Sequence, residues 1–108
     1  MKNMLKEKLA QGVKPLGTFV GTGSAAVVEC LGCAGLDFVI LDNEHSPIEA
    51  ETTAELVRAA ERRSITPLAR VREISRPAIL KLLDVGVQGL IIPDVHSAED
   101  VRRIVSYA

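Results

Sequence analysis

Four short apolar runs alternate with segments of helical periodicity, and this alternation constrains the fold of the chain more than any other feature. The apolar runs cover residues 16–21, 36–42, 66–71 and 88–92. The helical segments cover residues 3–11, 24–34, 47–63, 75–86 and 97–108. Strands that alternate with helices at this spacing predict a parallel sheet with right-handed crossovers. We therefore predict one α/β domain over residues 1–108, built from four βα units and a short N-terminal helix.

The second apolar run ends in the most informative segment of the chain. F-V-I-L at 38–41 leads directly into Asp42, Glu44 and His45. The next residues, S-P-I-E at 46–49, predict a helix start, because serine caps a helix, proline suits its first turn and glutamate reaches back to the cap. Two carboxylates and an imidazole are therefore expected between the carboxyl end of a strand and the amino end of a helix. This is where α/β proteins place their active sites.

One interpretation of the alternation is a dinucleotide-binding domain. G-T-G-S-A-A at 21–26 matches the motif G-x-G-x-x-A, and Asp42 follows about 20 residues later, where an acid that binds ribose is expected. However, the first apolar run is weakly apolar for the centre of a doubly wound sheet, and a helix precedes it. This interpretation also leaves Glu44, His45 and Arg70 without a role.

The other interpretation is the N-terminal half of a (β/α)8 TIM barrel, in which the carboxyl ends of all strands face one site. The four strand ends carry Gly21, Thr22, Gly23 and Ser24; Asp42, Glu44 and His45; Arg70 and Arg72; and Pro93, Asp94 and His96. Three of these ends carry ionisable side chains, whereas the opposite ends carry turn residues such as Gly35 and Gly86. This one-sided polarity favours the barrel.

Composition argues against several classes of protein. Apolar residues make up 47% of the chain and charged residues 25%, which is typical of a globular domain. No apolar run approaches the roughly 18–20 residues of a membrane span, and the charged start of the chain does not resemble a signal peptide. Aromatic residues, at 3%, are too few to stack on bases. We expect a cytoplasmic protein that binds neither membranes nor nucleic acid.

Cys30 and Cys33 form a C-x-x-C pair near the expected end of the second helix. The helix dipole opposes a thiolate at this end, and two thiols alone cannot complete a zinc site. We therefore expect both cysteines to be small, buried packing residues.

Five segments together resemble the HpcH/HpaI family of class II pyruvate aldolases, which includes 4-hydroxy-2-oxoheptanedioate aldolase and 2-dehydro-3-deoxyglucarate aldolase. They are G-T-F-V-G-T-G-S at 17–24, A-G-L-D-F-V-I-L-D-N-E-H at 34–45, P-L-A-R-V at 67–71, L-L-D-V-G-V-Q-G at 82–89 and I-I-P at 91–93. No segment is specific alone, but their order and combination are.

The resemblance implies roles for several residues. His45 is expected to be the catalytic base, Arg70 to stabilise the developing enolate, and Asp84 to raise the basicity of the histidine. Asp42 and Glu44 are expected to support the base and a metal-bound water. The small residues Gly21 and Ser24 are expected at the substrate. The resemblance also implies a divalent metal ion (Mg, Mn or Co), whose ligands are expected beyond residue 108.

The implied reaction is retro-aldol cleavage of a 4-hydroxy-2-oxo acid to pyruvate, or a related keto acid, and an aldehyde. The chemistry of the side chains supports this reaction independently of the resemblance. Histidine titrates near neutral pH and can take the hydroxyl proton, and arginine carries a permanent charge with a planar fork that can hold the enolate oxygen. The chain ends within a helix and is about half of a barrel of some 250 residues, so we expect a fragment that is inactive alone and a homo-oligomer. The alternatives are a nucleotide-binding oxidoreductase domain and a non-catalytic half-barrel that serves in assembly.

Overall fold

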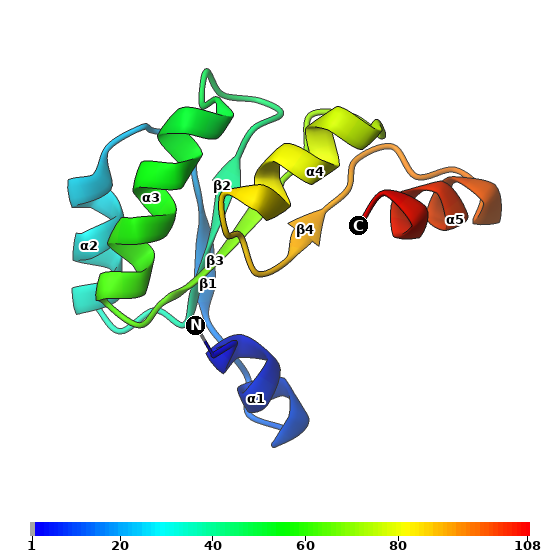
Figure 1. Cartoon of the computed structure of the whole chain (residues 1–108). Helices are drawn as coiled ribbons and strands as arrows, with labels where there is room; N and C mark the ends of the chain where they lie inside the picture. The colour runs from blue at the N-terminus through cyan, green and yellow to red at the C-terminus, as the bar shows by residue number, and fades with distance from the viewer. Residues whose placement is uncertain (1) are drawn as a thin grey trace.

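The computed structural model describes residues 2–108 and shows four parallel strands that alternate with helices (Figure 1). The strands are β1 (Gly17–Val20), β2 (Phe38–Asp42), β3 (Thr66–Arg70) and β4 (Leu90–Ile91). The helices are α1 (Met4–Ala10), α2 (Ala25–Cys33), α3 (Ala50–Arg62), α4 (Arg76–Asp84) and α5 (Ala98–Tyr107). The predicted order of elements is confirmed throughout.

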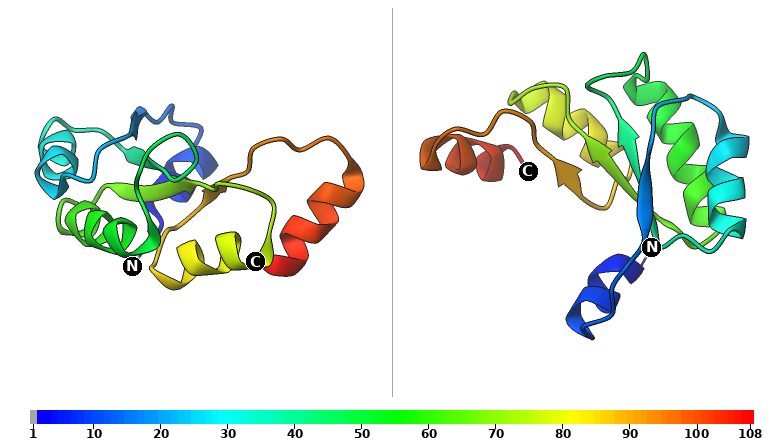
Figure 2. Two further views of the ribbon diagram at one scale, coloured as in Figure 1. Left: turned by 90° about the horizontal axis from the view of Figure 1, so that it is seen from above. Right: turned by 180° about the vertical axis from the view of Figure 1, so that it is seen from behind.

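The strands lie in the order β1-β2-β3-β4, so each crossover moves the chain one place in the same direction. Helices α2, α3, α4 and α5 follow one another along one side of the molecule (Figure 2). In a doubly wound sheet the first strand lies inside the sheet and helices cover both faces. Here β1 is an edge strand, so the dinucleotide-binding interpretation is wrong, and the fold is that of the N-terminal half of a (β/α)8 barrel.

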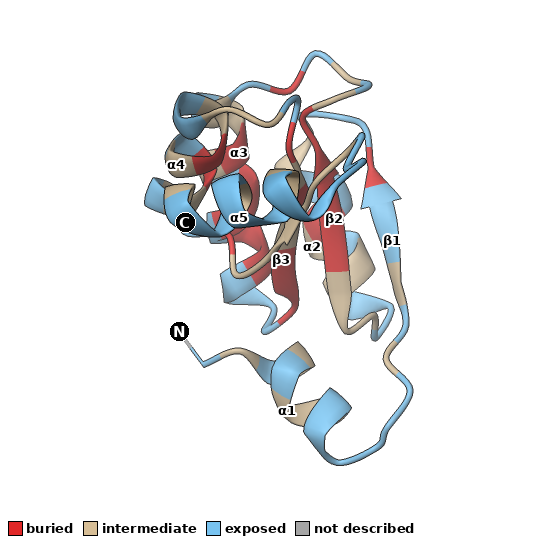
Figure 3. Cartoon of the chain, turned by 90° about the vertical axis from the view of Figure 1, so that its right-hand side faces the viewer, coloured by how far each residue is buried: buried red, intermediate tan, exposed pale blue. Residues whose placement is uncertain are grey.

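The hydrophobic core lies between the sheet and the helices, and Figure 3 shows the buried residues concentrated around β2 and β3. Val39 and Leu41 of β2 and Ala69 of β3 are fully buried there against Leu56 of α3 and Ile79 of α4. Side chains alternate between the two faces of a strand. The residues that follow Leu41 and Ala69 therefore point to the opposite, open face of the sheet.

The structure corrects the expected start of the third helix. Helix α3 begins at Ala50, and its N-cap Glu49 makes no side-chain capping hydrogen bond. The hydroxyl of Ser46 instead donates to the backbone carbonyl of Asp42 and accepts from the backbone N–H of Ile48. Serine therefore fixes the preceding loop here, because its hydroxyl serves a local turn as readily as a helix end.

The structure also corrects the expected burial of Cys30 and Cys33, which are both exposed. Helix α2 presents Val28 to the core, with Ala25 and Leu31 packed beside it. Cys30 and Cys33 follow Val28 by two and five positions, which places them roughly 140–160° from it around the helix and so toward solvent. None of the helices within residues 2–108 is both long and apolar enough to cross a membrane.

Candidate functional site

Asp42 and Arg70 are neighbours in the sheet, because the last residue of β2 pairs in register with the last residue of β3. The Arg70 Nη2 donates to Asp42 Oδ2 over 2.7 Å, and Nε donates to Oδ1 over 3.2 Å. The two side chains are only 24% and 10% exposed. A two-point contact between a guanidinium and a carboxylate fixes the plane of both groups. The parallel register thus turns two strand ends into one rigid unit.

Asp42 also organises the loop that follows β2. Its Oδ1 accepts the backbone N–H groups of Glu44 over 2.9 Å and of His45 over 3.0 Å. Arg70 and these amides together lower the pKa of Asp42, against the opposing effect of its burial. The carboxylate therefore stays ionised and positions Arg70 and the loop at once.

The loop brings the imidazole of His45 to the same place. Its Nε2 lies 3.1 Å from Oε1 of Glu44, and that oxygen lies 3.4 Å from Nε of Arg70. The His45 ring is 69% exposed, whereas Glu44 is 16% exposed. The structure thus gathers Asp42, Glu44, His45 and Arg70 into one cluster, which we call the strand-end cluster. It is held firmly on one side and faces solvent on the other.

The strand-end cluster includes an aromatic contact that sequence reasoning missed. The Arg70 Cζ lies 4.7 Å from the centroid of the Phe19 ring on β1. A guanidinium over an aromatic face is attracted by the ring and stays planar against it. The alternation of side chains within β1 was the feature that could have indicated this contact. Together with the register, it places Phe19 on the same face of the sheet as Asp42 and Arg70.

A buried polar network supports the loop from the helix side, and sequence reasoning missed this too. The Asn43 backbone N–H donates to the carbonyl of Arg70 over 3.0 Å. Its Oδ1 accepts from the hydroxyl of Thr53 over 3.1 Å, and that hydroxyl also lies 2.9 Å from the carbonyl of Glu49. Asn43 and Thr53 are both buried. The network joins the loop to β3 and to the first turn of α3.

Thr53→Val keeps the branched shape of this side chain and removes its hydroxyl. We expect the free energy of unfolding to fall by about 1–3 kcal/mol, because Asn43 Oδ1 loses its donor in a buried place. Urea unfolding measures the change. Thr52→Val is the matched control on the adjacent, half-buried position, and an equal effect of the two substitutions would contradict a structural role for the network.

The lowered pKa of Asp42 predicts a dependence of stability on pH. The pKa of this carboxyl is lower in the folded chain than the unfolded value of about 3.9. Its ionised form therefore stabilises the fold fully above about pH 4, and this contribution is lost as the pH falls toward the folded-state pKa. We expect the urea midpoint to fall between about pH 5 and about pH 2, and Asp42→Asn to flatten the fall. Parallel profiles for the two proteins would contradict this account.

The remaining predicted residues lie at different distances from the strand-end cluster. Gly21 and Ser24 follow β1, at the carboxyl ends of the strands. Ser24 is the N-cap of α2, and its hydroxyl accepts from the Val27 N–H. Asp84 is the last residue of α4, which ends near the amino ends of the strands, whereas Arg70 lies at their carboxyl ends. Within one chain the structure does not bring it to His45. Its expected effect on the histidine stays a prediction.

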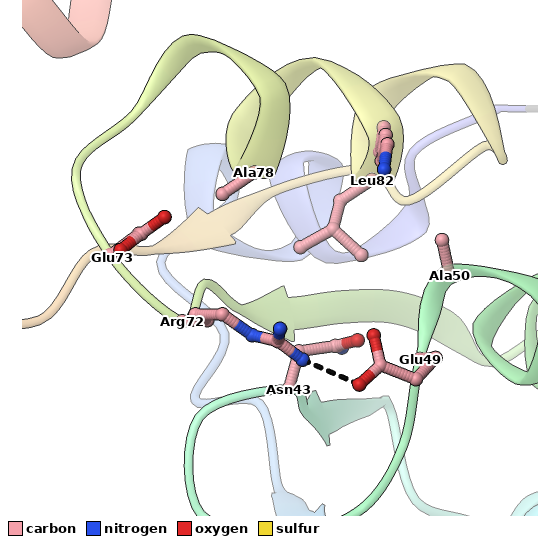
Figure 4. A pocket seen from close by; sticks show the side chains of 8 residues that line it. Asn43, Glu49, Ala50, Arg72, Glu73, Ala78 and Leu82 are labelled. Atoms are coloured by element: carbon pink, nitrogen blue, oxygen red, sulfur yellow. Dashed lines mark hydrogen bonds and ion pairs between the residues drawn. The ribbon is translucent and has the colours of Figure 1, made fainter.

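A separate pocket of about 140 Å³ lies between α3, α4 and the loops after β2 and β3 (Figure 4). Arg72 and Glu49 form an ion pair of 2.7 Å across it, and Asn43, Ala50, Glu73, Ala78, Lys81 and Leu82 complete the lining. Neither His45 nor Arg70 lines this pocket. The side chains of the strand-end cluster instead lie on the open face of the sheet. Four strands do not enclose this face.

The residues of the strand-end cluster do not by themselves fit a divalent metal. Both oxygens of Asp42 accept N–H groups, and Oε1 of Glu44 contacts His45 and Arg70. Between residues 2 and 108, no three or more histidine, cysteine, aspartate or glutamate side chains are gathered as metal ligands. A catalytic metal normally takes several protein ligands and keeps an open position. On their own, these residues therefore do not provide a site for a catalytic metal.

Comparison with known proteins agrees with this geometry. The family model described as HpcH/HpaI aldolase/citrate lyase matches residues 16–108. The 2-keto-3-deoxy-L-rhamnonate aldolase of Escherichia coli O9:H4 (strain HS) is 32% identical over 106 residues, which are 98% of this chain and 40% of that protein. The chain belongs to the HpcH/HpaI aldolase/citrate lyase family.

Solved structures resemble the chain equally well. Citrate synthase SbnG has a TM-score of 0.92 and 38% identity, covering 96% of this chain and 42% of that one. An HpcH/HpaI aldolase from Desulfitobacterium hafniense DCB-2 has a TM-score of 0.90 and 33% identity, covering 96% and 40%. The chain thus spans about two fifths of the length of these relatives.

Proposed function

We propose that a protein built on this chain is a carbon–carbon lyase that cleaves a 4-hydroxy-2-oxo acid to pyruvate, or a related keto acid, and an aldehyde. The strand-end cluster carries this proposal, because it holds a base and a fixed cation together at the carboxyl ends of parallel strands. The relatives named as aldolases support the same class of reaction. The proposal places the reaction in the cytoplasm, on a small-molecule substrate.

His45 is the base in this proposal. Because its Nε2 lies against the Glu44 carboxylate, a neutral ring carries its proton there and leaves Nδ1 free to accept. Nδ1 takes the proton of the C4 hydroxyl, the C3–C4 bond breaks, and C4 leaves as the aldehyde. The electron pair of the broken bond forms the enolate of pyruvate, with its charge on the C2 oxygen. A proton added at C3 then gives pyruvate.

Arg70 stabilises the enolate. Asp42 occupies Nε and Nη2 of the guanidinium, while no hydrogen bond within residues 2–108 uses Nη1. This edge is available to an anionic oxygen. The carboxylate of Asp42 and the ring of Phe19 hold the guanidinium in place before the charge develops. A donor fixed in advance stabilises the transition state without reorganisation during the reaction.

The proposal includes a divalent metal (Mg, Mn or Co), whose chemistry is to polarise the keto acid. Its ligands must come from outside residues 2–108, because the strand-end cluster does not supply them. Gly21 and Ser24 are proposed to border the substrate, since they follow β1, whose last residue Val20 pairs with Leu41, the neighbour of Asp42 in β2. Asp84 makes no direct contact with His45 of its own chain in this mechanism.

The test uses a hybrid in which residues 1–108 replace the matched segment of the E. coli aldolase. The hybrid is mixed with pyruvate and Mn²⁺ in deuterated water, and the methyl protons of pyruvate are followed by NMR. Formation of the enolate exchanges these protons for deuterium, so we expect exchange that a chelator abolishes. The intact E. coli protein is the positive control. A hybrid that folds as a barrel but exchanges no faster than buffer would overturn the proposal.

A further inference from the structure

The pocket between α3 and α4 is a second concave site, and its walls belong to consecutive units of the fold. All of its lining residues lie between positions 43 and 82, in the stretch that runs from the end of β2 to α4. Segments that precede or follow this stretch therefore do not form its walls. Because neither His45 nor Arg70 lines it, the pocket is separate from the strand-end cluster.

Small and apolar side chains form the floor of the pocket. Ala78 and Leu82 of α4 line one side of it, and Ala50 of α3 lines the other (Figure 4). Leu82 is buried, and Ala78 packs against the hydrophobic core. Asn43 also reaches the pocket, but its side chain already takes part in the buried network described above. The groups that are free to bind a polar ligand are therefore the charged side chains around the floor.

Two cations, Arg72 and Lys81, and two carboxylates, Glu49 and Glu73, surround the floor. Arg72 Nη2 donates to Glu49 Oε1 over 2.7 Å, and Glu73 Oε1 accepts from the hydroxyl of Ser75 over 3.2 Å. Among the described residues, no hydrogen bond uses Nη1 of Arg72, Nζ of Lys81 or the Oε2 atom of either glutamate. The pocket therefore offers free donors and free acceptors side by side.

The charge and the size of the pocket define the kind of ligand that it fits. A simple anion or cation would lie next to charges of its own sign, whereas a zwitterion finds an opposite charge for each end. Arg72 and Glu49 are 52% and 68% exposed, so their ion pair contributes little to stability and can open to a ligand. The volume of about 140 Å³ is close to the roughly 150 Å³ of a cavity that holds one benzene molecule. A ligand of about six to eight non-hydrogen atoms therefore fits.

We propose that this pocket binds a small free α-amino acid with an apolar side chain. The carboxylate of the amino acid binds Lys81 and Arg72, its ammonium group binds Glu49 and Glu73, and its side chain covers the apolar floor. A residue within a peptide lacks both charged ends, and a dicarboxylate would meet the two glutamates, so neither fits as well. The inference does not depend on the proposed reaction.

The first experiment is isothermal titration calorimetry of the 108-residue chain with L-valine. We expect saturable binding of one L-valine per chain. Isovalerate and isobutylamine keep the branched carbon skeleton but lack the ammonium group and the carboxylate, respectively. We expect each to bind about tenfold more weakly or worse, because each leaves two charged side chains of the pocket without a partner. No binding of L-valine at millimolar concentration, or equally tight binding of either analogue, would overturn the proposal.

The second experiment assigns the two ends of the amino acid. Lys81→Gln is expected to weaken the binding of L-valine about tenfold and to reduce its advantage over isobutylamine. Glu73→Gln is expected to reduce the advantage of L-valine over isovalerate instead. Lys14→Gln removes an exposed lysine before β1, outside the pocket, and is expected to leave all three affinities unchanged. Equal affinities of the Lys81→Gln and Lys14→Gln proteins for L-valine would overturn the assignment. All three substituted residues are exposed, and circular dichroism checks that each variant keeps its helices.

The third experiment locates the bound amino acid by NMR. L-Valine is added to the chain labelled with nitrogen-15, and the backbone amide signals are followed. We expect the largest shifts at Ala50, Ala78 and Leu82, which line the pocket on both sides. Shifts centred on His45 and Arg70 instead would place L-valine at the strand-end cluster and overturn the proposal.

Discussion

Asp42→Ala is expected to lower the free energy of unfolding by about 3 kcal/mol, which is a large fraction of the stability of a domain this size. The carboxylate is 10% exposed and holds two nitrogens of Arg70 and the backbone amides of Glu44 and His45. Its removal leaves a partly buried guanidinium with only Glu44 nearby, and it leaves both amides without their acceptor. Urea unfolding at one fixed protein concentration measures the loss, because association also affects apparent stability.

The matched control is Glu55→Ala, which removes a carboxylate from an exposed pair. Glu55 and Arg58 lie 2.6 Å apart on α3, with side chains that are 66% and 63% exposed. Exposed pairs contribute little, because water and salt screen both charges. We expect an unchanged midpoint for this control. An Asp42→Ala protein as stable as the Glu55→Ala protein would show that the strand-end cluster does not order the loop.

His45→Ala is expected to slow the exchange of pyruvate methyl protons in the hybrid enzyme by about 100-fold or more, the usual contribution of a positioned base. The alanine removes the imidazole but leaves the hydrogen bond from the residue 45 backbone N–H to Asp42, which holds the loop. The unfolding midpoint should therefore change little. A large loss of exchange with unchanged stability separates a role in proton transfer from a structural role.

His96→Ala is the matched control for this experiment. His96 lies in the loop before α5, is exposed, and uses its backbone N–H to contact Asp100. It follows β4, and among the described residues it makes no hydrogen bond or ion pair with the strand-end cluster. We expect near-normal exchange for this variant. Equal losses for the two histidine variants would remove the assignment of His45 as the base.

Several features of the fold follow from local sequence. The alternation of strands and helices, and the N-caps formed by Ser75 and Ser97, depend on interactions between residues that are close in the chain. The hydroxyls of Ser75 and Ser97 accept N–H groups three residues ahead, as the pattern predicts. The predicted start of the third helix was wrong because the hydroxyl of Ser46 can either cap a helix or form hydrogen bonds within the loop. The structure shows the loop bonds, and the sequence pattern does not distinguish the two.

Residues of the site were predictable where they follow a strand and not where they meet across strands. Asp42, His45 and Arg70 stand at strand ends in the sequence, so their convergence needed only parallel strands. Phe19 and Thr53 were missed because their roles depend on contacts with other segments. Asp84 shows the converse. The family resemblance implied that it acts on His45, but α4 carries this residue toward the amino ends of the strands, away from the strand-end cluster.

The elements, their order and the residues at the strand ends could be predicted from the sequence, because hydrophobic periodicity and helix caps depend on residues that are close in the chain. Only the folded chain shows that Asp42 is the centre of the strand-end cluster, with Arg70 bound to its two oxygens and stacked on Phe19. The cause is register, because the alignment of neighbouring parallel strands sets which side chains face each other. These strands are joined by long crossovers that contain a helix, so no short turn between them defines the alignment.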